Sequence, residues 1–194
     1  MRQPLGAILA GGLGRRLGSE KATVLLDGRP LIYYPLDALA AVLRDVVVLA
    51  KADTPLPSLP GATIWIEPDL RRHPLVGIVQ ALELAGARSV LVCAADLPFV
   101  SADLVRCLAE ADPQGAPAVL AAERGQSQPL LGCYQPSALA LLDHTDERPL
   151  RDQVAEISPR LLEVDDPEQL FNVNNPEDLL QATALLDRRR VSRT

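Results

Sequence analysis

Short apolar runs alternate with helical patterns through the first 111 residues, and this alternation restricts the fold more than any other feature. Four runs have the length of buried strands, at residues 5–10, 45–50, 62–66 and 89–94. Leucines and other apolar residues recur at helical spacing over 31–43 and around 75–82. Because a strand–helix–strand crossover is right-handed and joins parallel strands, this order predicts an α/β fold with helices on both faces of a parallel sheet.

The rest of the chain adds weaker patterns of the same kind. Further strands are expected at 22–26, 116–122, 128–134 and 160–166. One helix is expected to end near residue 111, and others are expected near 136–143, 149–156 and 175–189. Hydrophobic residues make up 48% of the chain and aromatic residues only 3%, which favours a core of Leu, Val and Ala. We therefore expect a single-domain, Rossmann-like three-layer sandwich with a mostly parallel sheet. The domain would span residues 1–189, followed by a frayed tail at 190–194.

Charge and cysteine content exclude several classes of protein. The net charge is −6, whereas a nucleic-acid-binding surface must be basic, so no nucleic acid partner is expected. Cys93, Cys107 and Cys133 are scattered and show no metal-binding spacing. We interpret all three as buried thiols in a protein of the reducing cytoplasm. No segment is long and apolar enough to span a membrane, and no membrane partner is expected.

A glycine-rich segment, LAGGLGRRLGSEK, follows the first apolar run at residues 9–21. Its glycines are spaced one residue too widely for the dinucleotide fingerprint, and its lysine comes too late for a Walker A loop. Glycines still let the backbone approach a ligand closely, and the basic side chains suit a triphosphate. The alternative is a solvated surface turn. The basic residues are Arg15, Arg16 and Lys21.

Ligands of open α/β sheets bind beyond the carboxyl ends of the strands, where three polar loops are expected at 11–21, 67–74 and 95–98. Asp96 follows an apolar strand in the last of these loops. A carboxylate in this place suits Mg²⁺ that bridges phosphate oxygens. The alternative for Asp96 alone is an aspartate that caps the turn before Pro98.

Several segments together resemble a known family. Residues 9–21 follow the loop L-A-[GA]-G-x-[SG]-x-R-[ML]-G-x-x-K of nucleotidyltransferases with the nucleotide-diphosphosugar-transferase-like fold. Within that superfamily the chain resembles the molybdenum cofactor guanylyltransferases. The supporting segments are HPLVGIVQAL (73–82), AADLPFV (94–100), QPLLGCY (128–134) and FNVNNPEDL (171–179). The resemblance runs from Leu5 to about Leu180 and covers nearly the whole chain.

The resemblance implies transfer of GMP from GTP to the terminal phosphate of molybdopterin, or of its molybdenum-loaded form, with release of pyrophosphate. It implies Mg²⁺ held by Asp96, and transient contacts with other molybdenum cofactor proteins. The implied GTP-binding residues are Leu9, Ala10, Gly11, Gly12, Lys21, Asp69 and Asp96. The implied catalytic residues are Lys21, Arg15 and Arg16, whose positive charges neutralise the triphosphate, and Asp96, which acts through the Mg²⁺ that it holds. Asn172 and Asn174 would face the pterin phosphate or help to hold the metal.

Two positions depart from the family pattern. Leu49 stands where family members often have a polar residue, and His73 replaces the glycine of G-P-L-A-G. Three other functions remain open at this point: a cytidylyltransferase acting on the same cofactor, another small-substrate nucleotidyltransferase such as a sugar-1-phosphate enzyme, and a nucleotide-binding regulator without turnover. The Gly11–Gly12 pair and residues 74–77 favour guanine over cytosine, and Lys21 with Asp96 favours an enzyme.

Overall fold

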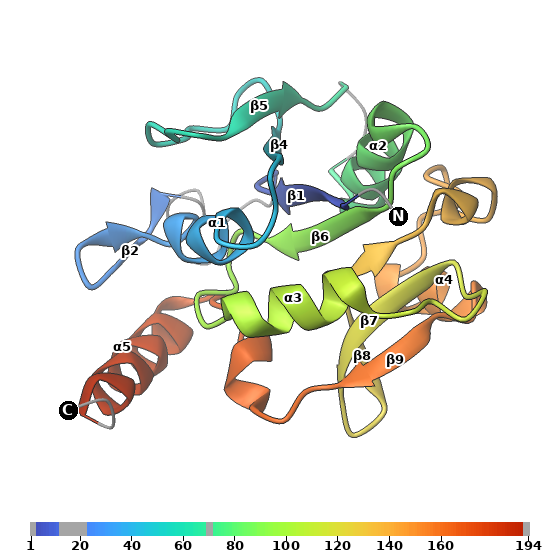
Figure 1. Cartoon of the computed structure of the whole chain (residues 1–194). Coiled ribbons are helices and arrows are strands. Elements are labelled where there is room, and N and C mark those ends of the chain that lie inside the picture. Colours follow the sequence, from blue (N-terminus) through green and yellow to red (C-terminus); the bar gives the residue numbers. More distant parts are fainter. Residues whose placement is uncertain (1–2, 12–22, 69–71, 192–194) are drawn as a thin grey trace.

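A seven-stranded sheet with strand order β5-β4-β1-β6-β8-β7-β9 forms the centre of the molecule (Figure 1). The structure is a computed structural model that describes residues 3–11, 23–68 and 72–191. Every pairing in the sheet is parallel except those of β8 with β6 and β7. The expected α/β sandwich with a mostly parallel sheet is therefore confirmed.

The expected alternation of strands and helices is present except between β4 and β5, which are joined by a loop without a helix. The sheet strands are β1 (Leu5–Leu9), β4 (Val46–Ala50), β5 (Thr63–Ile66), β6 (Val90–Ala94), β7 (Ala118–Glu123), β8 (Gln126–Tyr134) and β9 (Arg160–Glu163). The α-helices are α1 (Tyr33–Ala40), α2 (Pro74–Ala85), α3 (Ala102–Glu110), α4 (Leu150–Glu156) and α5 (Pro176–Val191). The described residues also form the 3₁₀ helices η2 (Pro136–Ala140) and η3 (Pro167–Leu170).

Successive residues of the central strands face opposite sides of the sheet, so their side chains pack in two separate hydrophobic clusters. In β4, for example, Val46 and Val48 join the cluster with α1 and α3, whereas Val47 and Leu49 join the cluster with α2 and α4. Helices α1 and α3 therefore cover one face and α2 and α4 the other (Figure 1). Strands β1, β4 and β6 are apolar throughout because both of their faces are buried.

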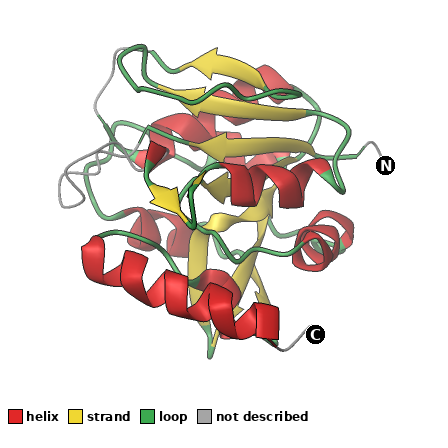
Figure 2. Ribbon diagram, turned by 90° about the vertical axis from the view of Figure 1, so that its left-hand side faces the viewer, coloured by secondary structure: helices red, strands yellow, loops and turns green. Residues whose placement is uncertain are grey.

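A third, smaller cluster joins the segment 24–31 to the C-terminal helix α5. Helix α5 packs beside the two-stranded hairpin of β2 (Leu25–Leu26) and β3 (Arg29–Pro30), as Figure 2 shows. Two helices begin with a side-chain N-cap. Ser101 Oγ accepts a hydrogen bond from Leu104 N at 3.1 Å. Asn175 Oδ1 accepts one from Asp178 N at 2.8 Å.

Some local expectations need correction. The strand expected at 22–26 is only the short β2, and the helix expected at 136–143 is the 3₁₀ helix η2. Helix α5 continues to Val191, two residues beyond its expected end. Cys93 and Cys133 are buried as expected, but Cys107 is exposed because it lies on the solvent side of the amphipathic helix α3. Within the described residues, no helix combines the length and apolar composition needed to cross a membrane.

Candidate active site

Polar residues gather at one edge of the sheet, where the parallel strands β1, β4, β5 and β6 end. Four buried polar or charged residues occur in the described part of the chain, and three of them, Lys51, Glu67 and Asp96, follow the ends of β4, β5 and β6. Gly11 follows β1 at the same edge. Such an edge is where open α/β sheets bind ligands, because loops diverge there and leave room.

Asp96 lies at the centre of this edge and is only 7% exposed. Its backbone oxygen accepts a hydrogen bond from Val173 N at 3.0 Å, which fixes the loop after β6 against the segment that precedes α5. Asn172 Nδ2 lies 3.5 Å from Asp96 Oδ1. The tertiary structure therefore brings together two predicted site residues that are 76 positions apart in the sequence.

Gln128, at the start of β8, extends this contact into a chain of three side chains. Gln128 Nε2 donates to Asn172 Oδ1 at 3.0 Å, and the amide nitrogen of Asn172 is thereby turned towards Asp96. The antiparallel pairing explains the placement: Cys93 faces Leu131, so the same register carried three residues further brings Gln128 level with Asp96. Sequence reasoning identified 128–134 as a strand and as a segment of the family resemblance, but it did not predict the contact of Gln128 with Asn172.

Lys51 and Glu67 were also missed. Lys51 Nζ lies 3.4 Å from Glu67 Oε2, and both side chains are 7% exposed. A signal was available, since each charged residue directly follows an apolar run, the same pattern that identified Asp96. We call Lys51, Glu67, Asp96, Gln128 and Asn172 the strand-end residues.

Other predicted site residues are placed less centrally or lie outside the described part of the chain. Leu9 is half-buried, Ala10 is buried, and Gly11 is half-exposed at the end of β1. Asn174 is exposed and donates through its side chain to the backbone oxygen of Asn172 at 3.5 Å. The predictions for Gly12, Arg15, Arg16, Lys21 and Asp69 fall on residues that the structure does not describe.

The two departures from the family pattern have structural explanations. Leu49 is fully buried in the cluster that faces α2, and its backbone oxygen accepts from Ala10 N at 2.8 Å. Its side chain is thus a core residue. His73 is the N-cap of α2, where its Nδ1 accepts from Leu75 N at 3.3 Å.

The chemistry available at this edge is electrostatic and not nucleophilic. Burial raises the pKa of the Cys93 thiol, and the Asp96 carboxylate raises it further, so this neighbouring thiol stays protonated. Among the described residues, no group of three or more His, Cys, Asp or Glu side chains is arranged to hold a metal ion. A cation bound at Asp96 would need oxygen ligands from a substrate and from water, as Mg²⁺ at phosphate sites commonly has.

Comparison with known proteins relates this chain to one family. Residues 6–163 match the family model described as "MobA-like NTP transferase domain". A molybdenum cofactor guanylyltransferase from Rhizobium johnstonii is 32% identical over 202 residues, which cover 94% of this chain and 92% of that protein.

Solved structures show the same fold. Molybdopterin-guanine dinucleotide biosynthesis protein A from Archaeoglobus fulgidus superimposes with a TM-score of 0.73 at 22% identity, over 95% of this chain and 99% of that one. The 2-C-methyl-D-erythritol 4-phosphate cytidylyltransferase from Thermus thermophilus gives a TM-score of 0.65 at 22% identity, over 95% and 98%. The fold thus serves enzymes that use different nucleotides, while the family match is specific: the chain belongs to the MobA-like NTP transferase family.

Proposed function

We propose that this protein is a molybdenum cofactor guanylyltransferase, which transfers GMP from GTP to the terminal phosphate of molybdopterin or of its molybdenum-loaded form. Pyrophosphate is the leaving group. The observation that carries the proposal is the buried Asp96 carboxylate joined to Asn172, because this contact unites the loop expected to hold the metal with the segment expected to meet the pterin phosphate. The family match and the relatives at about 32% identity support the same activity.

The reaction needs little from protein nucleophiles or bases. The attacking group is a phosphate oxygen of molybdopterin, which is already ionised at neutral pH. The protein must therefore align that oxygen with the α-phosphorus of GTP and neutralise the charge that collects on the triphosphate. In this proposal Arg15, Arg16 and Lys21 hold the phosphates, and the backbone of residues 9–12 holds the nucleoside.

Mg²⁺ fits the donor set at Asp96, since one protein carboxylate together with substrate phosphate oxygens is a common magnesium arrangement. When bound, it would withdraw charge from the phosphate oxygens. Asn172 donates its amide towards Asp96 Oδ1 and orients the carboxylate, and in this geometry Asn172 Oδ1 is engaged by Gln128. We therefore favour the pterin phosphate, and not the metal, as the ligand of this loop, with Asn174 as its exposed contact. Asp69 remains a proposed nucleoside contact.

Transient contacts with other molybdenum cofactor proteins are part of this proposal, because the family resemblance implies them. The test of the activity is pyrophosphate release with each of the four nucleoside triphosphates, with and without molybdopterin. We expect release only when GTP and molybdopterin are both present. Release that is fastest with CTP would identify a cytidylyltransferase, and nucleotide binding without release in any mixture would identify a regulator.

A further inference from the structure

Two charged side chains, Lys51 and Glu67, are buried at the ligand edge of the sheet. The proposed transfer of GMP at the α-phosphorus gives neither of them a role. Lys51 is 6% exposed and Glu67 is 8% exposed. Their charges lie 3.4 Å apart, and Lys51 Nζ also donates to the backbone oxygen of Pro68 at 2.6 Å. Removing two charges from water usually costs about as much as their attraction returns, so a buried ion pair is a poor source of stability. Its presence at a ligand edge points to a function.

The alternation of residues along the strands places the side chains of Lys51 and Glu67 on the face of the sheet that α2 covers. Alternate residues of β1 and β4, such as Ala7 and Leu49, pack in the cluster that contains α2, and Trp65 of β5 packs against that cluster. Gly11, Lys51 and Glu67 continue these alternations beyond the strand ends. Hydrogen bonds from Ala10 N to Leu49 O and from Glu67 N to Ala50 O, both 2.8 Å, keep the three strand ends level.

Two glycines leave the space that the Glu67 carboxylate occupies. A Cβ atom at Gly11 would lie 3.3 Å from Glu67 Oε1, and one at Gly77 would lie 2.9 Å from the same oxygen. Gly77 lies in the first turns of α2, where glycine is a poor helix former, so its presence needs such a reason. The carboxylate is thus held between the start of the glycine-rich segment and the N-terminal end of a helix, whose dipole favours an anion.

We propose that Glu67 is the residue that selects guanine, and that Lys51 is the positioning residue that holds its carboxylate in place. The inference rests on the proposed function and deepens it by naming side chains for the choice of base. A carboxylate only accepts hydrogen bonds. Guanine offers two adjacent donors, N1–H and the exocyclic amine, on one edge, whereas no other common base pairs two donors in this way. Glu67 is the buried acceptor next to Gly11, where the nucleoside is expected.

The test compares nucleotides that differ by single groups. Inosine triphosphate lacks only the exocyclic amine of guanine, and 2′-deoxyguanosine triphosphate lacks only a ribose hydroxyl. Equilibrium binding of GTP, inosine triphosphate, deoxyguanosine triphosphate and CTP is measured by calorimetry for the whole chain. The wild type should bind GTP at least about tenfold more tightly than inosine triphosphate, the scale of one hydrogen bond to a charged group.

Two single variants and one double variant assign that preference. In Glu67→Gln, the affinities for GTP and inosine triphosphate should lie within about twofold of each other. In Lys51→Met, the ratio of these two affinities should fall by about threefold or more. The double variant Lys51→Met with Glu67→Gln removes both charges, leaves no unpaired charge buried, and should fold and show the same loss as Glu67→Gln. Glu83→Gln is the control, because Glu83 is an exposed glutamate on α2, the helix against which the Glu67 carboxylate lies.

The outcomes separate this inference from the proposed function. A wild type that binds CTP as tightly as GTP contradicts both. A wild type that prefers GTP to CTP but does not distinguish GTP from inosine triphosphate overturns the inference alone, whatever the variants do. The inference is also overturned if the double variant still binds GTP more tightly than inosine triphosphate by the wild-type ratio. It is overturned as well if the double variant loses a preference for GTP over deoxyguanosine triphosphate and keeps the preference over inosine triphosphate, since the carboxylate would then contact the ribose.

Discussion

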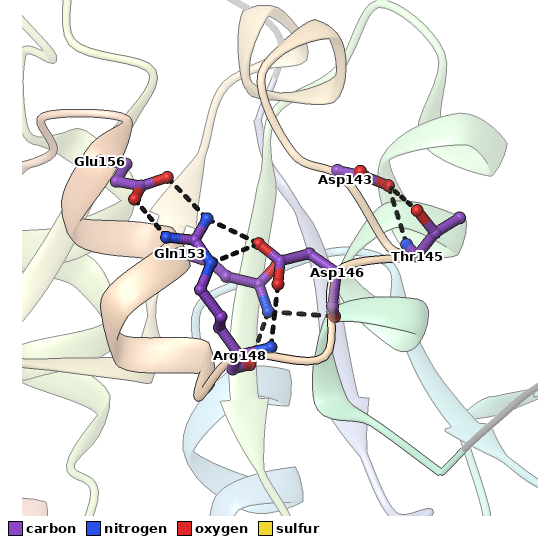
Figure 3. A network of polar contacts seen from close by, with 6 residues as sticks. All are labelled: Asp143, Thr145, Asp146, Arg148, Gln153 and Glu156. Carbon is purple, nitrogen blue, oxygen red and sulfur yellow. Dashed lines mark hydrogen bonds and ion pairs between the residues drawn. The ribbon is translucent and has the colours of Figure 1, made fainter.

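The strand-end residues and a second polar network, around Arg148, consist of similar side chains in opposite environments. The second network lies in the segment between β8 and β9 and contains Asp143, Thr145, Asp146, Arg148, Gln153 and Glu156 (Figure 3). We call it the α4 network. The side chain of Arg148 is 51% exposed and that of Glu156 is 60% exposed, whereas Lys51 and Glu67 are each 7% exposed. The difference in exposure accompanies a proposed difference in role, since the buried Lys51–Glu67 pair lies at the proposed ligand edge and the exposed Arg148–Glu156 pair holds a turn.

The α4 network organises the turn that leads into α4. Arg148 donates through Nε to Asp146 at 2.8 Å and through Nη2 to Glu156 at 2.9 Å. Gln153 is buried beneath them and donates to the backbone oxygen of Arg148 at 2.7 Å. The segment leaves β8 at Tyr134, which pairs with Val90 at the start of β6, so it departs from the edge opposite the strand-end residues. We therefore expect substitutions there to affect stability and leave activity unchanged.

The largest effect should come from Asp96→Asn. The amide keeps the size of the side chain but removes the charge expected to hold Mg²⁺, so turnover should fall at least about 100-fold while the fold is retained. The measurement is pyrophosphate release across a Mg²⁺ titration, with Mn²⁺ binding followed separately by electron paramagnetic resonance. Near-normal activity together with unchanged Mn²⁺ affinity would remove Asp96 from the metal site.

A smaller loss is expected for Gln128→Leu. Without the hydrogen bond from Gln128, the amide of Asn172 is free to rotate, and Asp96 loses its oriented donor. Turnover should fall by about tenfold, the scale of one hydrogen bond. Gln126→Leu is the matched control, because Gln126 lies on the same strand but is exposed. Equal effects of the two substitutions would show that Gln128 has no positioning role.

Arg148→Met should change stability and not turnover. The substitution keeps part of the apolar stem but removes the links to Asp146 and Glu156, and exposed ion pairs contribute little to the free energy of unfolding. The melting temperature should fall by less than about 4 °C. A loss of activity comparable to that of Gln128→Leu would contradict the separation between the two groups of residues.

The smallest effect concerns pH. Hydrogen bonds from Arg148 lower the pKa of Glu156 below its ordinary value of 4.5, and those from Thr145 lower the pKa of Asp143 below 3.8. Since both carboxyl groups have a lower pKa in the folded state, their contribution to stability is complete above the unfolded values and is lost as the pH falls through the folded values. Unfolding curves recorded from neutral pH to pH 3 should show this loss, and Glu156→Gln should flatten it. An identical pH dependence in wild type and variant would show that the pairing is absent in solution.

Much of the fold could be predicted from the sequence, because buried parallel strands appear as continuous apolar runs and helices as periodic ones. A polar residue that follows an apolar run can be recognised in the same way, and Asp96 was identified by this pattern. Lys51 and Glu67 show the same pattern, but a single charged residue after a strand does not reveal its partner. The prediction that Cys107 is buried was wrong because composition does not indicate which face of α3 it occupies.

The sequence by itself determined the α/β class, the family and the loop motifs, since these depend on local periodicity and on spacing within short segments. Only the tertiary structure decided which distant side chains meet. Strand order places β8 antiparallel beside β6 and so brings Gln128 level with Asp96, and the parallel register of β1, β4 and β5 brings Glu67 against Gly11. These contacts depend on the pairing of strands that are remote in the chain, and that pairing is set by the burial of the whole sheet and not by any one segment.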